Sequence, residues 1–236
     1  MWYYGLRYQQ LHAKRRANTV CSLLWGNVDS MNVEILCKIV LIVVFTLFSV
    51  IRIRYQYLAT RARLRTVIVE SKRYSIFLSI LICYEVGTLF LWLLYPQAIA
   101  FGRMDLALWL RYAGIILGIA ALLLFVWVHQ NLGKYFAIRL RMAEGHTIIN
   151  TGPYRWVRHP MYTAFAILHI ASFLLSANWF IGVTWTFGLT LILLLRVRRE
   201  ETMMLRMFGG HYALYMEKTG CFLPRALERA SFSRKK

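Results

Sequence analysis

Five apolar runs, each close to bilayer length, constrain this 236-residue chain more than any other feature. A helix needs about 20 apolar residues, with a range of about 17–25, to cross the hydrocarbon core of a membrane. The runs cover Met31–Ile51, Tyr74–Tyr95, Leu106–Val128, Met161–Ala177 and Trp179–Leu195. Hydrophobic residues make up 59% of the chain and charged residues 17%, whereas soluble domains average about 45–50% and about 25%. The sequence therefore predicts an all-α integral membrane protein with about five transmembrane helices.

The last two runs are separated only by the Ala177-Asn178 step, which predicts a tight antiparallel helical hairpin. Each of its helices would hold about 17 residues, or ~25 Å at ~1.5 Å per residue, which is short for a full span. The pattern divides the chain into an N-terminal tail at 1–30, a three-helix membrane scaffold at 31–128, and a region at 129–236 that gathers the polar motifs.

The net charge of +19 is distributed unevenly between the connecting segments. Segments 52–73, 129–160 and 196–236 hold 22 of the 29 lysines and arginines, and five crossings would place all three on one side. The positive-inside rule then predicts a cytoplasmic C-terminus, with basic loops facing anionic membrane lipids rather than a nucleic acid. The four cysteines lack the spacing of metal ligands, so no metal site is predicted.

Residues 145–162 form the first polar motif and read Gly-His-Thr-Ile-Ile-Asn-Thr-Gly-Pro-Tyr-Arg-Trp-Val-Arg-His-Pro-Met-Tyr. The Gly152-Pro153 pair predicts a turn, and Pro160 suits the first turn of the fourth span, where its missing N–H is no loss. His159 would then stand at a helix N-terminus at the membrane surface, a position that favours an anion. An interfacial anchor of aromatic residues is the competing interpretation.

The second polar motif, Arg196-Val197-Arg198-Arg199-Glu200-Glu201, follows the fifth run. The short hairpin returns it to the side of the first motif. Arg196 and Glu200 are four residues apart and therefore share a helix face. A solvated, charge-balanced helix end would explain the same residues, and an amphipathic helix broken near Gly209 follows.

Together these motifs resemble the isoprenylcysteine carboxyl methyltransferase family, which is related to membrane phospholipid methyltransferases. The residues that carry the resemblance are the 145–162 motif, the helical hairpin, Glu200-Glu201, Phe208-Gly209, Tyr212, Tyr215 and Leu223-Pro224. The resemblance covers roughly Leu132–Pro224. It implies an S-adenosylmethionine-dependent membrane methyltransferase whose catalytic region is 129–236, with a cofactor site on the cytoplasmic face and a lipid or lipidated acceptor.

The resemblance also implies individual residue roles. Cofactor contacts correspond by position to His146, Thr147, Ile148, Ile149, Tyr154, His159, Pro160, Met161, Tyr162 and Glu200. Arg196 matches the arginine that binds the substrate carboxylate, so Arg196 and Glu200 are the expected catalytic pair. A carboxylate acceptor is already ionised at neutral pH and needs no general base. An amine acceptor, as in phospholipid N-methylation, would have to lose a proton, with Glu200 or Glu201 as the candidate base.

Two polar residues inside the spans leave further alternatives open. Glu85 would be costly facing lipid, so we expect it to face the bundle interior, either in a structural hydrogen bond or in a substrate cavity. His169 is expected to bond between helices rather than to bind a ligand. A small transporter would typically show an internal repeat, which this chain lacks. A non-catalytic membrane scaffold is disfavoured by the combination of His159, Arg196 and Glu200.

Overall fold

The computed structural model describes residues 2–62, 66–68, 72–133, 141–143 and 147–225. His146, one of the expected cofactor contacts, lies outside the described residues. The elements in chain order are α1 (Trp2–Arg61), β1 (Thr66–Ile68), α2 (Lys72–Leu94), η1 (Pro96–Gly102), α3 (Leu108–Leu132), β2 (Arg141–Ala143), η3 (Gly152–Arg155), α4 (Pro160–Ser176), α5 (Trp179–Phe208) and α6 (Gly210–Lys218).

Four of the described helices are long and apolar enough to cross a bilayer, namely Met31–Arg61 of α1, α2, α3 and α5. The fifth apolar helix, α4, has 17 residues. Large apolar side chains such as Ile80, Ile116 and Phe187 point outward and are more than half exposed. Such surfaces suit lipid, whose acyl chains require no hydrogen bonds from the side chains they cover. The chain is an integral, multi-pass membrane protein.

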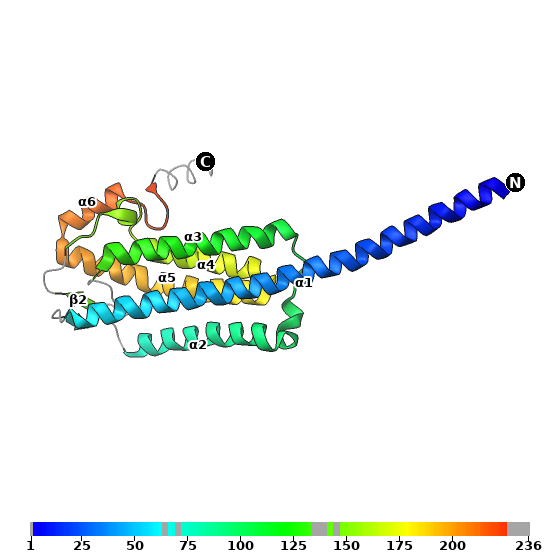
Figure 1. The fold of residues 1–236 in the computed structure, drawn as a ribbon. Coiled ribbons are helices and arrows are strands. Elements are labelled where there is room, and N and C mark those ends of the chain that lie inside the picture. The colour runs from blue at the N-terminus through cyan, green and yellow to red at the C-terminus, as the bar shows by residue number, and fades with distance from the viewer. Residues whose placement is uncertain (1, 63–65, 69–71, 134–140, 144–146, 226–236) are drawn as a thin grey trace.

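The first helix is longer than the sequence predicts at both ends. We expected a span at Met31–Ile51 after a separate tail, but α1 begins at Trp2 and ends at Arg61. The chain has no proline before Pro96, so nothing in this stretch removes a backbone donor from the helix. The N-terminal part of α1 projects away from the rest of the bundle (Figure 1).

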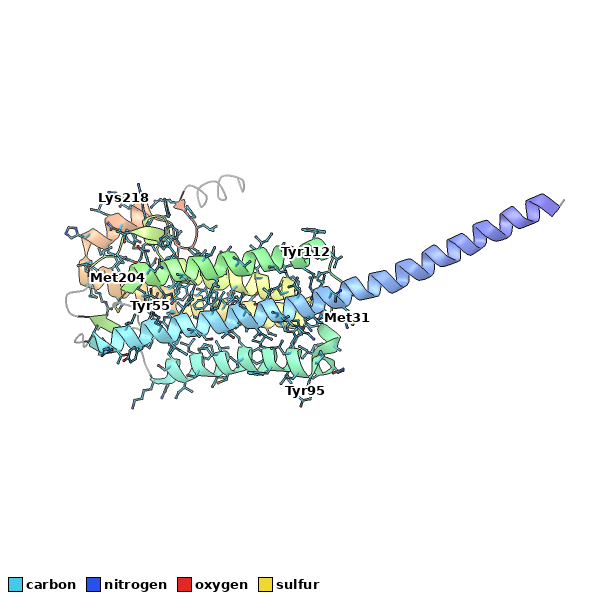
Figure 2. All side chains as sticks on the ribbon, in the orientation of Figure 1. Met31, Tyr55, Tyr95, Tyr112, Met204 and Lys218 are labelled. Atoms are coloured by element: carbon cyan, nitrogen blue, oxygen red, sulfur yellow. The ribbon has the colours of Figure 1, made fainter. Side chains whose placement is uncertain are left out.

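The helices run alternately between two ends of the bundle (Figure 1). Met31, Tyr95 and Tyr112 lie at one end, whereas Tyr55, Met204 and Lys218 lie at the other (Figure 2). We call the second the polar end. The two short strands are also at the polar end, where β1 pairs with β2 in antiparallel register, Val67 opposite Met142. These strands, which the all-α prediction did not include, join the α1–α2 connection to the α3–α4 connection.

Small residues bring α3 against α4 and α1. Gly114 and Gly118 are four residues apart on one face of α3, the spacing that lets membrane helices approach closely. A Cβ added at Gly114 would lie 2.9 Å from Cβ of Leu174, so a larger residue would push the helices apart. Farther along, Phe48, Phe125 and Leu168 belong to one buried cluster that joins all three helices.

The α4–α5 connection consists of Ala177 and Asn178 alone. Ala177 is left-handed, with φ 46°, and Asn178 caps α5 by accepting hydrogen bonds from the backbone N–H groups of Phe180 and Ile181. The Asn178 amide also donates to the Ile99 carbonyl at 2.9 Å, which ties the turn to η1. One asparagine therefore both begins α5 and anchors it.

The fifth run was expected to end at Leu195, but α5 continues for 13 residues beyond it, to Phe208. Gly209, with φ 53°, ends the helix and separates it from α6. The residues past Leu195 are good helix formers, and the Arg196–Glu200 pair supports the helix at i,i+4 spacing. Both residues therefore sit on one continuous rod that begins in the apolar bundle.

Candidate active site

The start of α4 and the last third of α5 meet at the polar end of the bundle. Pro160 is the first residue of α4, as its sequence position predicts, and His159 is the residue before it. Backbone bonds fix this corner: His159 donates its N–H to the Cys221 carbonyl at 3.0 Å, and Arg158 donates to Gly220 at 2.8 Å. The segment after α6 thus holds the entry to α4 in place.

Glu200 is the centre of the candidate site. Its Oε1 accepts a hydrogen bond from Arg196 Nε at 2.7 Å and one from the Tyr162 hydroxyl at 2.9 Å. Its Oε2 lies 3.5 Å from Nδ1 of His159. Arg196, His159 and Tyr162 are all buried. The structure thereby brings together four of the residues that the sequence predicts for the site, from α4 and α5.

The neighbouring Glu201 links the site to α6. Its Oε1 accepts from Arg158 Nε at 2.9 Å and lies 3.3 Å from Nε2 of His159. The same arginine donates to the backbone carbonyls of Met216, at 3.2 Å, and Thr219, at 2.5 Å. Arg158 therefore connects α5 to the end of α6, a role that its position in the motif did not reveal.

His159 lies between the two carboxylates, and they determine its charge. Burial disfavours the imidazolium, but hydrogen bonds and negative charge from Glu200 and Glu201 outweigh burial, so the pKa of His159 lies above its ordinary value. The sequence suggested that His159 meets a ligand carboxylate. In the structure, the ring contacts two carboxylates of the protein instead.

His159, Glu201 and Cys221 also place potential metal-ligating atoms within 4.8 Å of one another. Oε1 of Glu201, the oxygen that lies 3.3 Å from Nε2 of His159, already accepts from the Arg158 guanidinium. A fixed positive charge beside that oxygen opposes a metal cation, so we interpret the group as an ion-pair network.

Tyr154 approaches the same carboxylate from η3. Burial raises the pKa of its hydroxyl, and the negative charge of Glu200 raises it further. The Tyr154 carbonyl accepts a hydrogen bond from the Tyr215 hydroxyl at 2.7 Å, which ties η3 to α6. The turn before it requires Gly152, whose φ is 56° and whose Cα faces the Asn131 side chain too closely for a Cβ.

The Thr147–Ile149 segment leads into η3 without helical structure. Thr147 is exposed, and Ile148 and Ile149 are half-buried. Within the described residues, no hydrogen bond or ion pair joins these three to the Glu200 network, so their cofactor role stays a prediction.

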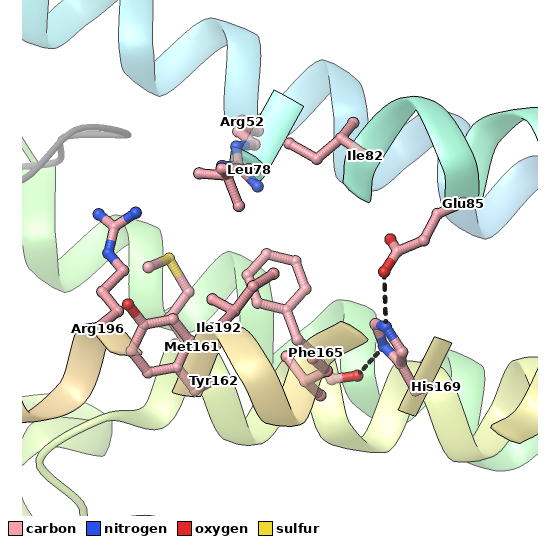
Figure 3. A pocket seen from close by; sticks show the side chains of 11 residues that line it. Arg52, Leu78, Ile82, Glu85, Met161, Tyr162, Phe165, His169, Ile192 and Arg196 are labelled. Atoms are coloured by element: carbon pink, nitrogen blue, oxygen red, sulfur yellow. Dashed lines mark hydrogen bonds and ion pairs between the residues drawn. The ribbon is translucent and has the colours of Figure 1, made fainter. Parts of the chain in front are cut away.

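A cavity lined by Arg196 and Tyr162, two of the residues that contact Glu200, extends between the helices as far as Glu85 and His169 (Figure 3). Helices α1, α2, α4 and α5 all contribute, so the expected scaffold helices also form part of the site. Its lining residues are Arg52, Leu78, Ile82, Glu85, Met161, Tyr162, Phe165, His169, Leu189, Ile192 and Arg196.

Arg52 is a lining residue that the sequence reasoning missed. It is the first basic residue after the apolar run of α1, a position that equally suits an anchor at the membrane surface. In the structure, its guanidinium lies 5.8 Å from the Phe165 ring centre, on the cavity wall. Its position in the sequence gave no signal for this role, because the contact depends on how α1 packs against α4.

The comparisons with family models and with known proteins agree on one family. Residues 114–206 match the model of the isoprenylcysteine carboxyl methyltransferase (ICMT) family. The probable protein-S-isoprenylcysteine O-methyltransferase of Oryza sativa subsp. indica is 26% identical over 54% of this chain and 68% of that protein. The Saccharomyces cerevisiae protein-S-isoprenylcysteine O-methyltransferase is 31% identical over 37% of this chain and 36% of its own length. The Homo sapiens protein is 24% identical over 60% and 51%.

A solved structure, that of the eukaryotic intramembrane Ras methyltransferase ICMT, aligns with a TM-score of 0.46 and 22% identity. The alignment covers 67% of this chain and 54% of that chain. The matched region of this chain thus spans about half of the human and structural relatives. The family match at residues 114–206 includes the Glu200 network and most of α3, α4 and α5.

Proposed function

We propose that this chain, which matches the isoprenylcysteine carboxyl methyltransferase family over residues 114–206, is a membrane methyltransferase of that family and methylates a carboxylate on a lipid-embedded or lipidated acceptor. The methyl donor would be S-adenosylmethionine, bound at the cytoplasmic face. One observation carries the proposal: Arg196 is held by Glu200 at the wall of an apolar cavity within the membrane bundle.

The cavity suits an acceptor with a charged head and an apolar tail. Arg196 and Arg52 line it near the polar end, and Leu78, Ile82 and Ile192 add hydrocarbon surface, with Ile82 closer to Glu85 (Figure 3). A guanidinium can hold a carboxylate through two parallel hydrogen bonds, which fixes the orientation of the reacting oxygen. Glu200 binds Arg196 through Nε and thereby sets the direction of the guanidinium plane.

The residues around Glu200 suit the donor. S-Adenosylmethionine, when bound, supplies an electrophilic methyl group to the carboxylate oxygen. The residues that would hold it are His146–Ile149, Tyr154, the His159–Tyr162 corner and Glu200. Tyr154, which lies close enough to Glu200 for that charge to raise the pKa of its hydroxyl, offers an aromatic face to the sulfonium.

This chain's own residues would act mainly by positioning. An ionised carboxylate is already nucleophilic, so holding it in line with the methyl group contributes most of the rate. The alternative, methylation of a phospholipid amine, needs a base. Glu200 and Glu201 are poorly placed for that role, because Arg196, Tyr162, Arg158 and His159 already engage their oxygens.

The acceptor class can be tested with the full chain reconstituted in lipid nanodiscs and a donor carrying a tritiated methyl group. We expect transfer to an S-prenylated cysteine carboxylate and release of the label as methanol in alkali, because esters hydrolyse there and N-methyl groups do not. Label that resists alkali, or transfer to phosphatidylethanolamine alone, would contradict carboxyl methylation.

A further inference from the structure

Glu85 and His169 form a polar pair deep in the cavity, away from the Glu200 network. Nε2 of His169 lies 3.3 Å from Oε1 of Glu85, so the pair joins α4 to α2. Both residues line the cavity, and Figure 3 shows them at the opposite end from Arg196 and Tyr162. The Glu85 side chain is 20% exposed and that of His169 is 7%, so Glu85 is the more accessible partner.

The hydrogen bonds of His169 determine which atoms of the pair can bond a ligand. Its Nδ1 lies 2.7 Å from the Phe165 carbonyl, which can only accept, so Nδ1 carries a proton. Nε2 then either carries a second proton and donates to ionised Glu85, or accepts from a neutral Glu85 carboxyl group. In both arrangements the pair is neutral overall, and Glu85 keeps an acceptor oxygen besides Oε1.

Such an acceptor is costly to cover with hydrocarbon. The described hydrogen bonds engage the Glu85 side chain through Oε1 only. A plain acyl or isoprenoid tail filling the cavity would remove water from the other oxygen and return no hydrogen bond. A site with a buried polar group therefore favours a ligand that pairs with that group and rejects the analogue that lacks it.

The helices set the depth of the pair. Tyr162 and His169 are seven residues apart on α4, which corresponds to ~10 Å along the helix axis. Arg196 and Leu189 have the same separation on α5 and line the same cavity. A tail that starts at Arg196 would thus reach Glu85 about 10 Å from its carboxylate.

We propose that Glu85, oriented by His169, recognises a hydroxyl group on the hydrocarbon tail of the acceptor, about 10 Å from the reacting carboxylate. The inference rests on the proposed function for the identity of the reacting group. It narrows the acceptor class from any lipidated carboxylate to one whose tail carries a hydrogen-bond donor at that depth.

The test uses two N-acetyl-S-alkyl-cysteine probes of equal length, one plain and one with a hydroxyl about 10 Å from the carboxylate. Binding is measured by calorimetry and transfer by label, with the full chain in nanodiscs. We expect the wild type to bind the hydroxylated probe about 10- to 100-fold more tightly, because the plain probe leaves a buried acceptor without a hydrogen bond. Glu85→Leu should remove this preference, and Glu85→Gln, which keeps a carbonyl acceptor, should retain it.

Control measurements separate recognition from a structural role. Ser172→Ala, one turn farther along α4, removes only a hydrogen bond to the Leu168 carbonyl and should leave the preference unchanged. Moving the hydroxyl along the tail in the wild type should abolish the preference without any mutation. Equal binding of both probes by the wild type, or an unchanged preference in Glu85→Leu, would overturn the inference.

The two proposals fail in different ways. Transfer to both probes without preference would reject the role of Glu85 and leave carboxyl methylation standing. Preferential binding without transfer would reject carboxyl methylation and leave the recognition of the hydroxyl standing. Equal weakening of both probes by Glu85→Leu would show that the pair only joins α2 to α4.

Discussion

The Glu200 network and the Glu85–His169 pair are both polar groups in an apolar bundle, but they are built differently. Around Glu200 and Glu201, two arginines, a histidine and a tyrosine converge, and backbone carbonyls of α6 complete the set. The deeper pair has one contact between side chains, at 3.3 Å. The comparison teaches that the first network engages several oxygens of both carboxylates, whereas the described hydrogen bonds engage only one oxygen of Glu85.

Glu200→Ala should have the largest effect, because it removes the carboxylate that lies between Arg196 and His159 and leaves Arg196 without its ion-pair partner Glu200. Breaking a buried ion pair costs about 3–5 kcal/mol, and we expect a loss near the lower limit since the Glu200 side chain is 19% exposed. Methyl transfer should fall by more than 100-fold, an effect of about 2.7 kcal/mol on the barrier. Urea or thermal unfolding measures the loss of stability, and the transfer assay measures the loss of rate. Unchanged stability would mean that the network is not a fixed unit.

Arg196→Lys should lower transfer by about 10- to 100-fold while cofactor affinity changes little, because lysine keeps the charge but loses the planar fork. Arg198→Lys is the matched control, since Arg198 is exposed two residues along the same helix. Near-normal transfer by Arg196→Lys would indicate that a positive charge without the planar fork suffices at this position, and would favour an amine acceptor.

Arg158→Gln should loosen α6 rather than abolish the site. It removes the hydrogen bonds from the Arg158 guanidinium to Glu201 and to the carbonyls of Met216 and Thr219. Hydrogen bonds that involve a charged group contribute about 1.5–3 kcal/mol each to stability. Hydrogen exchange of the α6 amides should become at least 10-fold faster. Exchange that rises equally in α3 would mean global destabilisation instead.

The smallest expected effect is a pH dependence from His159. Its pKa is higher in the folded protein than the ordinary value of about 6.5, so its stabilising contribution is complete below pH ~6.5 and is lost as pH rises through the folded pKa. The difference in stability between wild type and His159→Gln should shrink over that range. His211→Gln, an exposed change on α6, is the control. A difference that grows with pH would mean that the network holds His159 in its neutral form.

Most of the site could be predicted because its residues lie in two short motifs at helix ends. His159, Tyr162, Arg196 and Glu200 were expected at the site from those motifs and the family resemblance, and in the structure the other three each contact Glu200, while their roles stay a prediction. Proline at the start of α4 and the i,i+4 spacing on α5 are local signals that tertiary packing did not override.

The parts that could not be predicted depend on contacts between distant segments. Arg52 looks like any basic residue at the end of a span until α1 packs against α4. The length of α5 was underestimated because hydropathy marks where a helix leaves lipid, not where it ends. The partner of Glu85 could not be identified from the sequence, because His169 is 84 residues away and the two meet only when α2 and α4 come together.

The two-residue turn at Ala177-Asn178 has a mechanical consequence. It joins α4 and α5 at one end, so the angle between the helices at the turn sets how far apart they lie about 25 Å away, where the candidate site is. A change of a few degrees in this angle moves the site-bearing ends of α4 and α5 by ~1–2 Å. A misplacement of a reacting group by about 1 Å can cost 100-fold in rate. Substitutions at Asn178, far from any reacting atom, should therefore lower methyl transfer by changing the angle between α4 and α5.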